Sequence, residues 1–148
     1  MNKLHKPLTL MLIGIFLTIM TGYSKGADKI YEDVVVNEVV NIYDGDTFTV
    51  NIYCWPNIIG KNISIRIYGI DTPEIRGTEG VVKKLALDAK KMTSYYLLSA
   101  DVVELRSIRR GKYFRIIADV YIDGVSLGNI LIKAGLAKAY HGGKRPAW

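Results

Sequence analysis

The clearest strand pattern lies in the middle of the chain and reads Asn62-Ile63-Ser64-Ile65-Arg66-Ile67-Tyr68. Isoleucine alternates with more polar side chains, and this period of two is typical of a strand with one apolar face and one polar face. The segment therefore predicts a half-buried strand. Its isoleucines should face a core, and its arginine should lie on the opposite face.

Four other segments are rich in Val, Ile and aromatic residues and are bounded by turn signals, which favours strands. They are Val34–Ile42, Thr47–Tyr53, Val102–Ser107 and Phe114–Ile122. In the last of them, alternation places Phe114 on the core face with Ile116, Ala118, Val120 and Ile122. Turns are expected at Asp44-Gly45, Arg109-Arg110-Gly111 and Asp123-Gly124, and loops at 55–61 and 69–80.

Two segments have the periodicity of helices. In residues 81–99, apolar side chains recur at three- and four-residue steps and predict a buried stripe of Val82, Leu85, Ala89, Met92 and Tyr96. A shorter helix is expected over residues 126–134, ended by Gly135. Three strands, a helix, two strands and a helix suit a mainly β member of the α+β class, a five-stranded OB-fold barrel with two helices. Barrels of this kind commonly bind oligonucleotides.

Composition sets broad limits on what the chain does. Its 148 residues suit one domain, and 49% apolar residues are enough for a core. The net charge of +6 is compatible with a polyanionic partner but does not single one out. The single cysteine, Cys54, excludes an intramolecular disulfide. Thiol catalysis is disfavoured, because one of the two histidines lies in the N-terminal leader.

The first 24 residues have the pattern of a secretory signal. Lys3 and Lys6 precede an apolar run from Leu8 to Met20, followed by small residues that suit cleavage after Ser24 or, as second choice, after Gly26. We therefore expect a secreted or periplasmic monomer without a stable membrane span after cleavage. An uncleaved anchor is the alternative. The remainder divides into an exposed segment at 25–33, a domain at 34–140 and a basic tail at 141–148.

Two acidic segments stand beside predicted strands. They are Asp44-Gly45-Asp46-Thr47 and Asp71-Thr72-Pro73-Glu74. Each taken singly is typical of a turn or cap. Taken together, they place Asp46, Asp71 and Glu74 where three carboxylates can converge at one mouth of the barrel. Such carboxylates repel one another without a cation or proton, and oxygen ligands suit Ca²⁺ or Mg²⁺.

Two strand arginines suggest what such a site would act on. Arg66 and Arg115 both lie opposite apolar strand faces, where arginine is usually no more than a solvated side chain. The functional interpretation is a pair of planar, permanently charged donors aimed at a phosphate. Two arginines and a metal ion are sufficient to stabilise the charge that builds up when a phosphodiester is cleaved, with Glu74 orienting or activating water.

These residues occur in an order that resembles the staphylococcal nuclease (thermonuclease) family, over roughly residues 34–140. The resemblance rests on four ordered motifs: Asp44-Gly45-Asp46-Thr47, Ile65-Arg66-Ile67 leading into Ile70-Asp71-Thr72-Pro73-Glu74, Lys112-Tyr113-Phe114-Arg115, and Leu131 to Lys138. One departure is Phe114, where the family often has glycine. A phenylalanine there can tilt Arg115.

The resemblance implies an OB-type barrel and a role for each residue of the site. Asp46 and Asp71 would bind Ca²⁺ through carboxylates and Thr72 through its backbone carbonyl. Arg66 and Arg115 would hold the scissile phosphate, and Glu74 would act as general base or position the water. Lys112 and Tyr113 would contact a neighbouring phosphate, and Tyr140 would pack near the nucleotide. Asp44 is expected to serve the turn or to support the ligands without binding the ion itself. The implied activity is endonucleolytic hydrolysis of DNA and RNA to 3′-phosphate ends.

Two other functions stay open at this point. The first is a non-catalytic OB-fold protein of the cell envelope that binds nucleic acid, for which Phe114 is the supporting motif change. The second is a structural domain of the envelope without any nucleic-acid role, which leaves the two arginines unexplained. Cleavage assays and salt-sensitive oligonucleotide binding separate the three.

Overall fold

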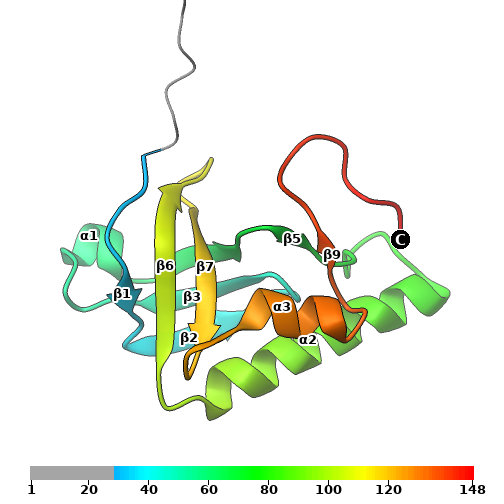
Figure 1. Ribbon diagram of the computed structural model, residues 1–148, viewed down its shortest axis with the longest axis horizontal. Coiled ribbons are helices and arrows are strands. Elements are labelled where there is room, and N and C mark those ends of the chain that lie inside the picture. The colour runs from blue at the N-terminus through cyan, green and yellow to red at the C-terminus, as the bar shows by residue number, and fades with distance from the viewer. Residues whose placement is uncertain (1–28) are drawn as a thin grey trace, which may run out of the picture.

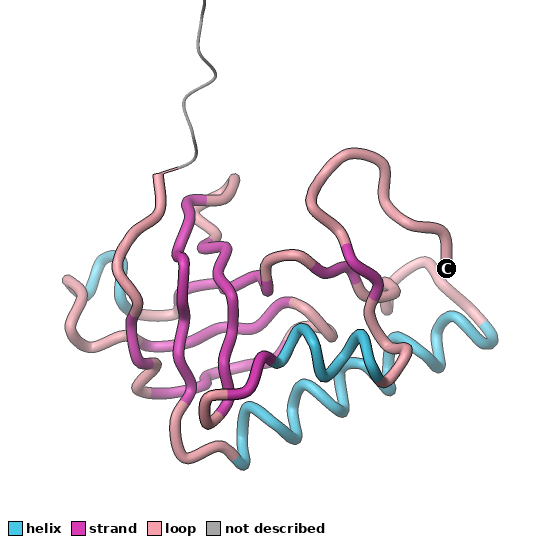
Figure 2. The backbone as a smooth tube through the Cα atoms, viewed as in Figure 1, coloured by secondary structure: helices cyan, strands magenta, loops and turns pink. Residues whose placement is uncertain are grey.

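The computed structural model describes residues 29–148, and Figures 1 and 2 show a curled sheet with helices packed against it. The strands of the main sheet follow the order β1-β6-β7-β4-β3-β2, and β8 pairs with β7. Their bounds are β1 (Val34–Val35), β2 (Glu38–Ile42), β3 (Thr47–Asn51), β4 (Ile63–Ile67), β6 (Val103–Arg110), β7 (Ile116–Ile122) and β8 (Val125–Ser126). A separate pair joins β5 (Ile70–Asp71) to β9 (Lys138–Ala139).

The segment predicted as the first strand supplies both edges of the main sheet. It is interrupted between Val35 and Glu38, so β1 pairs with β6 while β2 pairs with β3. One continuous piece of chain thus reaches both edges of the sheet, which forces the sheet to curl. The strand β4 pairs in parallel with β7, as Ile65 with Ile116. The predicted mainly β OB-fold class is confirmed, with β5, β8 and β9 as additional short strands.

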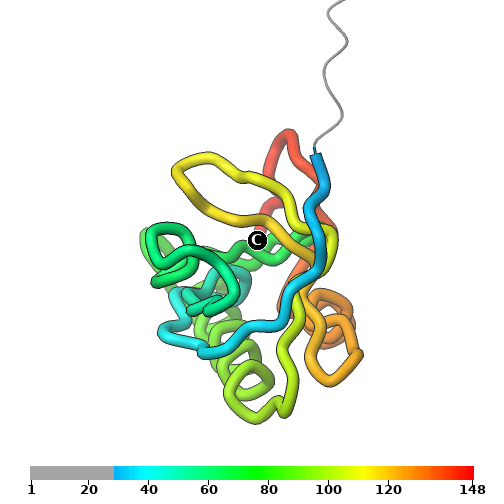
Figure 3. Tube along the Cα trace, turned by 90° about the vertical axis from the view of Figure 1, so that its left-hand side faces the viewer, coloured from blue at the N-terminus to red at the C-terminus, as the bar shows by residue number. Residues whose placement is uncertain are grey.

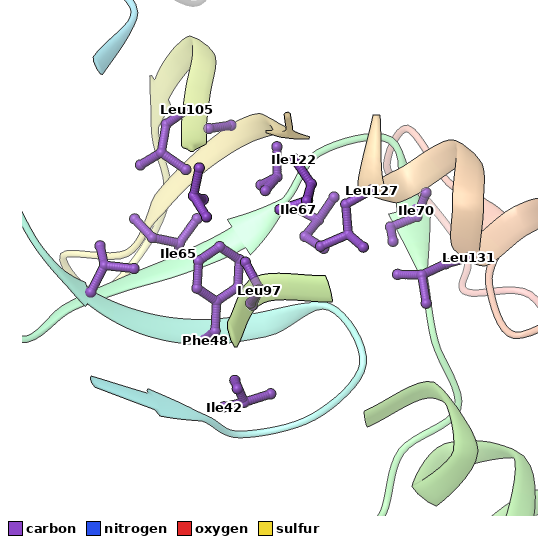
Figure 4. Packing of buried hydrophobic residues seen from close by; sticks show 14 of the residues in the cluster. Ile42, Phe48, Ile65, Ile67, Ile70, Leu97, Leu105, Ile122, Leu127 and Leu131 are labelled. Carbon is purple, nitrogen blue, oxygen red and sulfur yellow. The ribbon is translucent and has the colours of Figure 1, made fainter. Parts of the chain in front are cut away.

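The core fills the concave side of this curled sheet (Figure 4). Phe48 and Ile65 on neighbouring strands are fully buried, as are Leu105 of β6 and Leu127 and Leu131 of the third helix. Alternation along β4 is as predicted, since Ile65 and Ile67 are buried while Ser64, Arg66 and Tyr68 are half-buried on the other face. Truncating a fully buried phenylalanine such as Phe48 costs on the order of 3–5 kcal/mol.

Three helices are present among the described residues: α1 (Asn57–Gly60), α2 (Gly80–Ser99) and α3 (Leu127–Lys133). The first is a single turn within a stretch predicted as loop. The second forms where predicted, and Ala89 is buried as predicted, but the other residues of its buried line, Ala86, Thr93 and Leu97, each lie one position after a predicted one. Leu85, Met92 and Tyr96 only flank the core. The small residues in this line let α2 approach the β2–β3 turn closely.

The prediction that Phe114 faces the core is wrong. The strand β7 begins at Ile116, and Phe114 is 72% exposed. Tyr113 and Phe114 both have left-handed backbones, with φ values of 56° and 61°, because the chain reverses there. The amide of Gly111 donates to the carbonyl of Arg115 across this turn, 2.8 Å away. Figure 3 shows the turn projecting from the barrel.

The predicted signal segment at residues 1–24 lies outside the described residues. Within residues 29–148, none of the helices combines the length and apolar character that a membrane span requires.

Candidate active site

The turn between β2 and β3 fixes the position of Asp46. The backbone amide of Asp46 donates to Asp44 Oδ1 at 3.0 Å, so Asp44 serves the turn as expected. The hydroxyl of Thr93 on α2 donates to the carbonyl of Gly45 at 2.7 Å. A Cβ atom at Gly45 would lie 2.7 Å from the Cβ of Ala89, so this residue is glycine because the helix approaches so closely. The turn is therefore held from both sides.

Arg66 connects two parts of the site. It lies in β4, directly before the chain turns through Gly69 into β5, which ends in Asp71. Its Nη1 atom lies 2.5 Å from Asp46 Oδ1, and its Nη2 atom lies 3.1 Å from Asp71 Oδ1. The two aspartates, 25 residues apart in sequence, thus share one guanidinium.

Both aspartates are almost fully shielded from water, at 2% exposure each. Desolvation by burial raises the pKa of Asp46 to about 6, although Arg66 and hydrogen bonds from Thr47 and Thr72 act in the opposite direction. The charged form of this carboxylate is therefore not fully compensated by the single guanidinium. A site with this deficit attracts additional positive charge.

The donor set fits a hard divalent cation. Asp46 and Asp71 supply carboxylate oxygens, which Ca²⁺ prefers. The backbone amide of Thr72 donates to Asp46 Oδ2 at 3.1 Å, which places this residue directly beside the pair. Among residues 29–148, no group of three or more His, Cys, Asp or Glu side chains gathers at one point. Two carboxylates converge, rather than the three that the sequence suggested.

Glu74 lies outside this pair. Its side chain is 47% exposed, and it forms an ion pair with Arg145. The Nε atom of Arg145 lies 3.4 Å from Asp71 Oδ1, so Arg145 lies between Glu74 and Asp71. Glu74 also lines an open cleft together with Tyr43, Arg76 and Lys90.

The remaining predicted residues divide between two places. Lys112 and Tyr113 lie in the β6–β7 turn and are exposed, Tyr113 at 92%. Arg115 follows them, half-buried, and the register that pairs Arg66 with Ile117 puts it on the face that carries Arg66. No hydrogen bond or ion pair found among residues 29–148 joins these three side chains to the aspartates. Tyr140 follows β9, and its hydroxyl donates to the carbonyl of Gly143 at 2.9 Å.

Sequence reasoning noted a basic tail but missed how much of it contacts the site. Trp148 Nε1 donates to Asp71 Oδ2 at 3.2 Å, and Arg145 bonds to Glu74 and Asp71 as described above. The available signals were the Gly142-Gly143 pair, which permits a reversal, and the Lys144-Arg145 pair after it. Neither signal specified which carboxylates the tail would reach.

A cavity of about 580 Å³ lies away from the carboxylates, next to the start of β4 and β7. Trp55, Ile59, Ile63 and Ile108 form much of its wall. Its lining contains one acid, Glu32, and none of the aspartates of the site. The chemistry therefore points to the aspartate–arginine cluster and not to this larger hollow.

Comparison with known proteins agrees with this geometry. A family model described as "Staphylococcal nuclease homologue" matches residues 64–147. Endonuclease YncB of Bacillus subtilis is 34% identical over 80% of this chain and 52% of its own length. The SPbeta prophage-derived endonuclease YokF of the same species is 34% identical over 72% of this chain and 33% of its own. Thermonuclease of Staphylococcus hyicus is 28% identical over 80% and 63%.

The chain thus spans about a third to two thirds of the curated relatives it matches. The family model covers more than half of this chain, including Arg66, Asp71, Thr72, Glu74, Arg115 and Arg145. The resemblance inferred from the ordered motifs is confirmed: the chain belongs to the staphylococcal nuclease family.

Proposed function

We propose that this protein is an exported, Ca²⁺-dependent endonuclease that hydrolyses phosphodiester bonds of DNA and RNA and leaves 3′-phosphate ends. The observation that carries the proposal is the pair of buried aspartates sharing the Arg66 guanidinium. Clustered carboxylates with uncompensated charge suit a divalent cation, and an arginine beside them suits a phosphate. Family membership and the endonuclease names of two relatives support the choice of nucleic acid as substrate.

In this proposal Asp46, Asp71 and the carbonyl of Thr72 hold the cation. When bound, Ca²⁺ supplies positive charge that neutralises the carboxylates and stabilises the negative charge building up on the phosphate. Arg66 then has its guanidinium available for a phosphate oxygen. Arg115, on the same face, provides a second guanidinium for the same phosphate. Lys112 and Tyr113 extend the contacts to the next phosphate.

Glu74 acts as general base toward the attacking water. Its carboxylate accepts a proton from a water molecule, whose oxygen forms a new bond to phosphorus while the bond from phosphorus to the 5′ oxygen breaks. The departing oxygen takes a proton from solvent, and the phosphate stays on the 3′ side. Glu74 must first leave Arg145, so that its carboxylate oxygen is free to accept the proton from water.

The direct test is cleavage by the purified protein. Plasmid and a single-stranded RNA should be degraded with Ca²⁺ and protected by a chelator, and mass spectrometry of oligonucleotide products should find 3′-phosphate ends. Asp71→Asn should abolish the reaction, while Asp101→Asn, an exposed carboxylate at the end of α2, should leave it unchanged. Intact substrate at every Ca²⁺ concentration would rule the activity out.

One observation favours a second candidate, a nucleic-acid-binding protein without hydrolysis: Glu74 is already engaged by Arg145. For that candidate, oligonucleotides should bind with strong salt dependence and remain intact. Export is tested separately, by N-terminal sequencing of the protein recovered from the culture medium or periplasm. A mature N-terminus at residue 25 or 27 is expected.

A further inference from the structure

The end of the chain folds back over the candidate active site. After β9, Gly142 and Gly143 take left-handed backbones with φ of 105° and 87°, which reverses the chain direction. Figure 1 shows residues 142–148, here called the strap, looping beyond β9 and ending near the loop between β5 and α2. The strap therefore lies over residues that the proposed reaction needs.

Besides the hydrogen bond from the Tyr140 hydroxyl to the carbonyl of Gly143, five side-chain contacts hold the strap in this position. Three go to the site: Arg145 to Glu74, Arg145 Nε to Asp71 Oδ1 at 3.4 Å, and Trp148 Nε1 to Asp71 Oδ2 at 3.2 Å. Two come from Lys138 of β9, whose Nζ donates to the carbonyl of Ala147 at 2.5 Å and lies 4.4 Å from the centre of the Trp148 ring. The contacts thus join the strap both to the site and to the strand that precedes it.

Asp71 is the point where the strap and a cation would compete. One of its oxygens accepts from Arg66 and forms an ion pair with Arg145, and the other accepts from Trp148. A cation ligated by Asp71 must replace at least one of these donors, and it repels any guanidinium that stays. Arg66 is fixed by a central strand, whereas Arg145 is 51% exposed on a segment without strand pairing. Arg66, which turns to phosphate in the proposed function, stays within the site, and Arg145 is therefore the donor that leaves it.

Once displaced, Arg145 has a suitable next partner. Glu74 and the strap lie where β4 and β5 end, whereas Lys112 and Tyr113 lie near the start of β7, at the opposite end of β4. A polynucleotide centred on Arg66 would pass both ends. Arginine is the side chain best suited to bidentate phosphate contact, and no other predicted phosphate-binding residue lies on the Glu74 side.

We propose that the strap closes this site in the absence of a divalent cation, and that Arg145, displaced from Asp71 when the cation binds, becomes a third phosphate-binding arginine on the Glu74 side of the scissile bond. The inference rests on the proposed function. To that function it adds Arg145 as a phosphate-binding residue, a contact on the Glu74 side of the substrate, and an opening of the strap when the cation binds.

Opening of the strap is measured without any turnover. Trp55 and Trp148 are the two tryptophans of the chain, so Trp55→Phe leaves Trp148 as sole reporter. In this variant, acrylamide quenching of Trp148 should rise on Ca²⁺ addition and saturate at the concentration where calorimetry shows the site filled. Unchanged quenching with a filled site would overturn the strap and leave the proposed nuclease intact. If no Ca²⁺ binds, both proposals fall.

The phosphate contact is tested by comparing Arg145→Gln with Lys144→Gln. The adjacent Lys144 is exposed and forms no ion pair or hydrogen bond found among the described residues, so it is the matched control. Arg145→Gln should bind Ca²⁺ about fivefold or more tightly, a usual size for coupling between sites. It should also flatten the plot of log kcat/KM on single-stranded DNA against log salt by about 0.7, the value for one phosphate contact.

Lys144→Gln should change neither quantity, and Arg145→Lys should restore most of the salt dependence. If Arg145→Gln binds Ca²⁺ more tightly but has an unchanged salt slope, the phosphate contact is overturned. The strap would then block the site without binding substrate. Equal Ca²⁺ affinity in Arg145→Gln and the parent would overturn the competition at Asp71.

Discussion

Arg66 and Asp46 form an ion pair from which water is almost excluded. The 2.5 Å contact joins side chains that are 15% and 3% exposed, and the same guanidinium continues to Asp71. In the cation-free protein, Arg66 is thus what makes two neighbouring buried carboxylates tolerable. This structural role leads to the first prediction, and the proposed function adds a second role for Arg66, phosphate binding when a cation is present.

Arg66→Met should destabilise the metal-free protein by about 3 kcal/mol, because removing one partner leaves buried charges uncompensated. Arg106→Met is the control, since its pair with Glu104 is 37% and 30% exposed and solvent screens such pairs, so its loss should cost much less. Urea unfolding in a chelator measures both. Equal losses of unfolding free energy in the two variants would show that the buried ion pair stabilises the protein no more than the exposed one.

The stability of the protein should fall as pH rises, because Asp46 loses its proton. Burial raises the pKa of Asp46 from its ordinary value of 3.8 to about 6 in the folded protein, so the folded state binds the proton more tightly than the unfolded chain. The contribution to stability is then complete below pH about 4 and is lost as pH rises through about 6, by roughly 3 kcal/mol in total. In a chelator, the free energy of unfolding of the parent, taken relative to that of Asp46→Asn, should fall by roughly 3 kcal/mol between acid and neutral pH. A difference that does not vary with pH would contradict the shift.

Much of the fold followed from local pattern. The alternation around Arg66 and the periodicity of residues 81–99 concern near neighbours along the chain, so the sequence predicted β4 and α2 well. The one-residue shift of the buried line on α2 arose because Thr93 is polar yet buried, where its hydroxyl binds the Gly45 carbonyl. Hydrophobicity alone does not reveal such a partner.

The parts of the site that escaped prediction depend on distant segments. Arg145 and Glu74 are 71 residues apart, and Trp148 and Asp71 are 77 apart. No spacing rule links such positions. The error at Phe114 has a different origin, since alternation was extended by two residues into a turn whose left-handed backbone takes the side chain out of the strand pattern.

Glu74→Gln should reduce kcat by about 10² to 10⁴, the usual contribution of a general base, with a small change in KM. Glu79→Gln supplies a matched control, as an exposed glutamate before α2. Steady-state assays with Ca²⁺ separate the two constants. If Glu74→Gln turned over like Glu79→Gln, Glu74 would have no part in the chemistry.

Phe114→Gly should leave stability unchanged or raise it by up to about 1 kcal/mol. Glycine relieves a left-handed backbone that costs other residues about 1–2 kcal/mol, and part of this gain is offset by a more flexible unfolded chain. Tyr113→Gly, with the same geometry, should behave alike. A loss of about 3–5 kcal/mol for Phe114→Gly would instead mark a core phenylalanine.

The packing of the β2–β3 turn on α2 gives the last prediction. Gly45→Ala should destabilise the protein and weaken Ca²⁺ binding, because the new methyl would lie 2.7 Å from the Cβ of Ala89 and 2.9 Å from the Cγ2 of Thr72. Relief of such overpacking requires the turn that carries Asp46 to move, at a cost of about 1–3 kcal/mol. Ala89→Gly alone should cost about 1 kcal/mol through helix propensity.

In the double variant Gly45→Ala with Ala89→Gly, the costs should be less than additive, because removing the Ala89 methyl makes room for the one added at Gly45. The Thr72 contact remains, so rescue should be partial. Urea unfolding gives the coupling energy between the two substitutions. Calorimetry gives the Ca²⁺ affinity, which falls if Asp46 is displaced. Simple additivity in both measurements would mean that close packing on α2 does not determine where Asp46 lies.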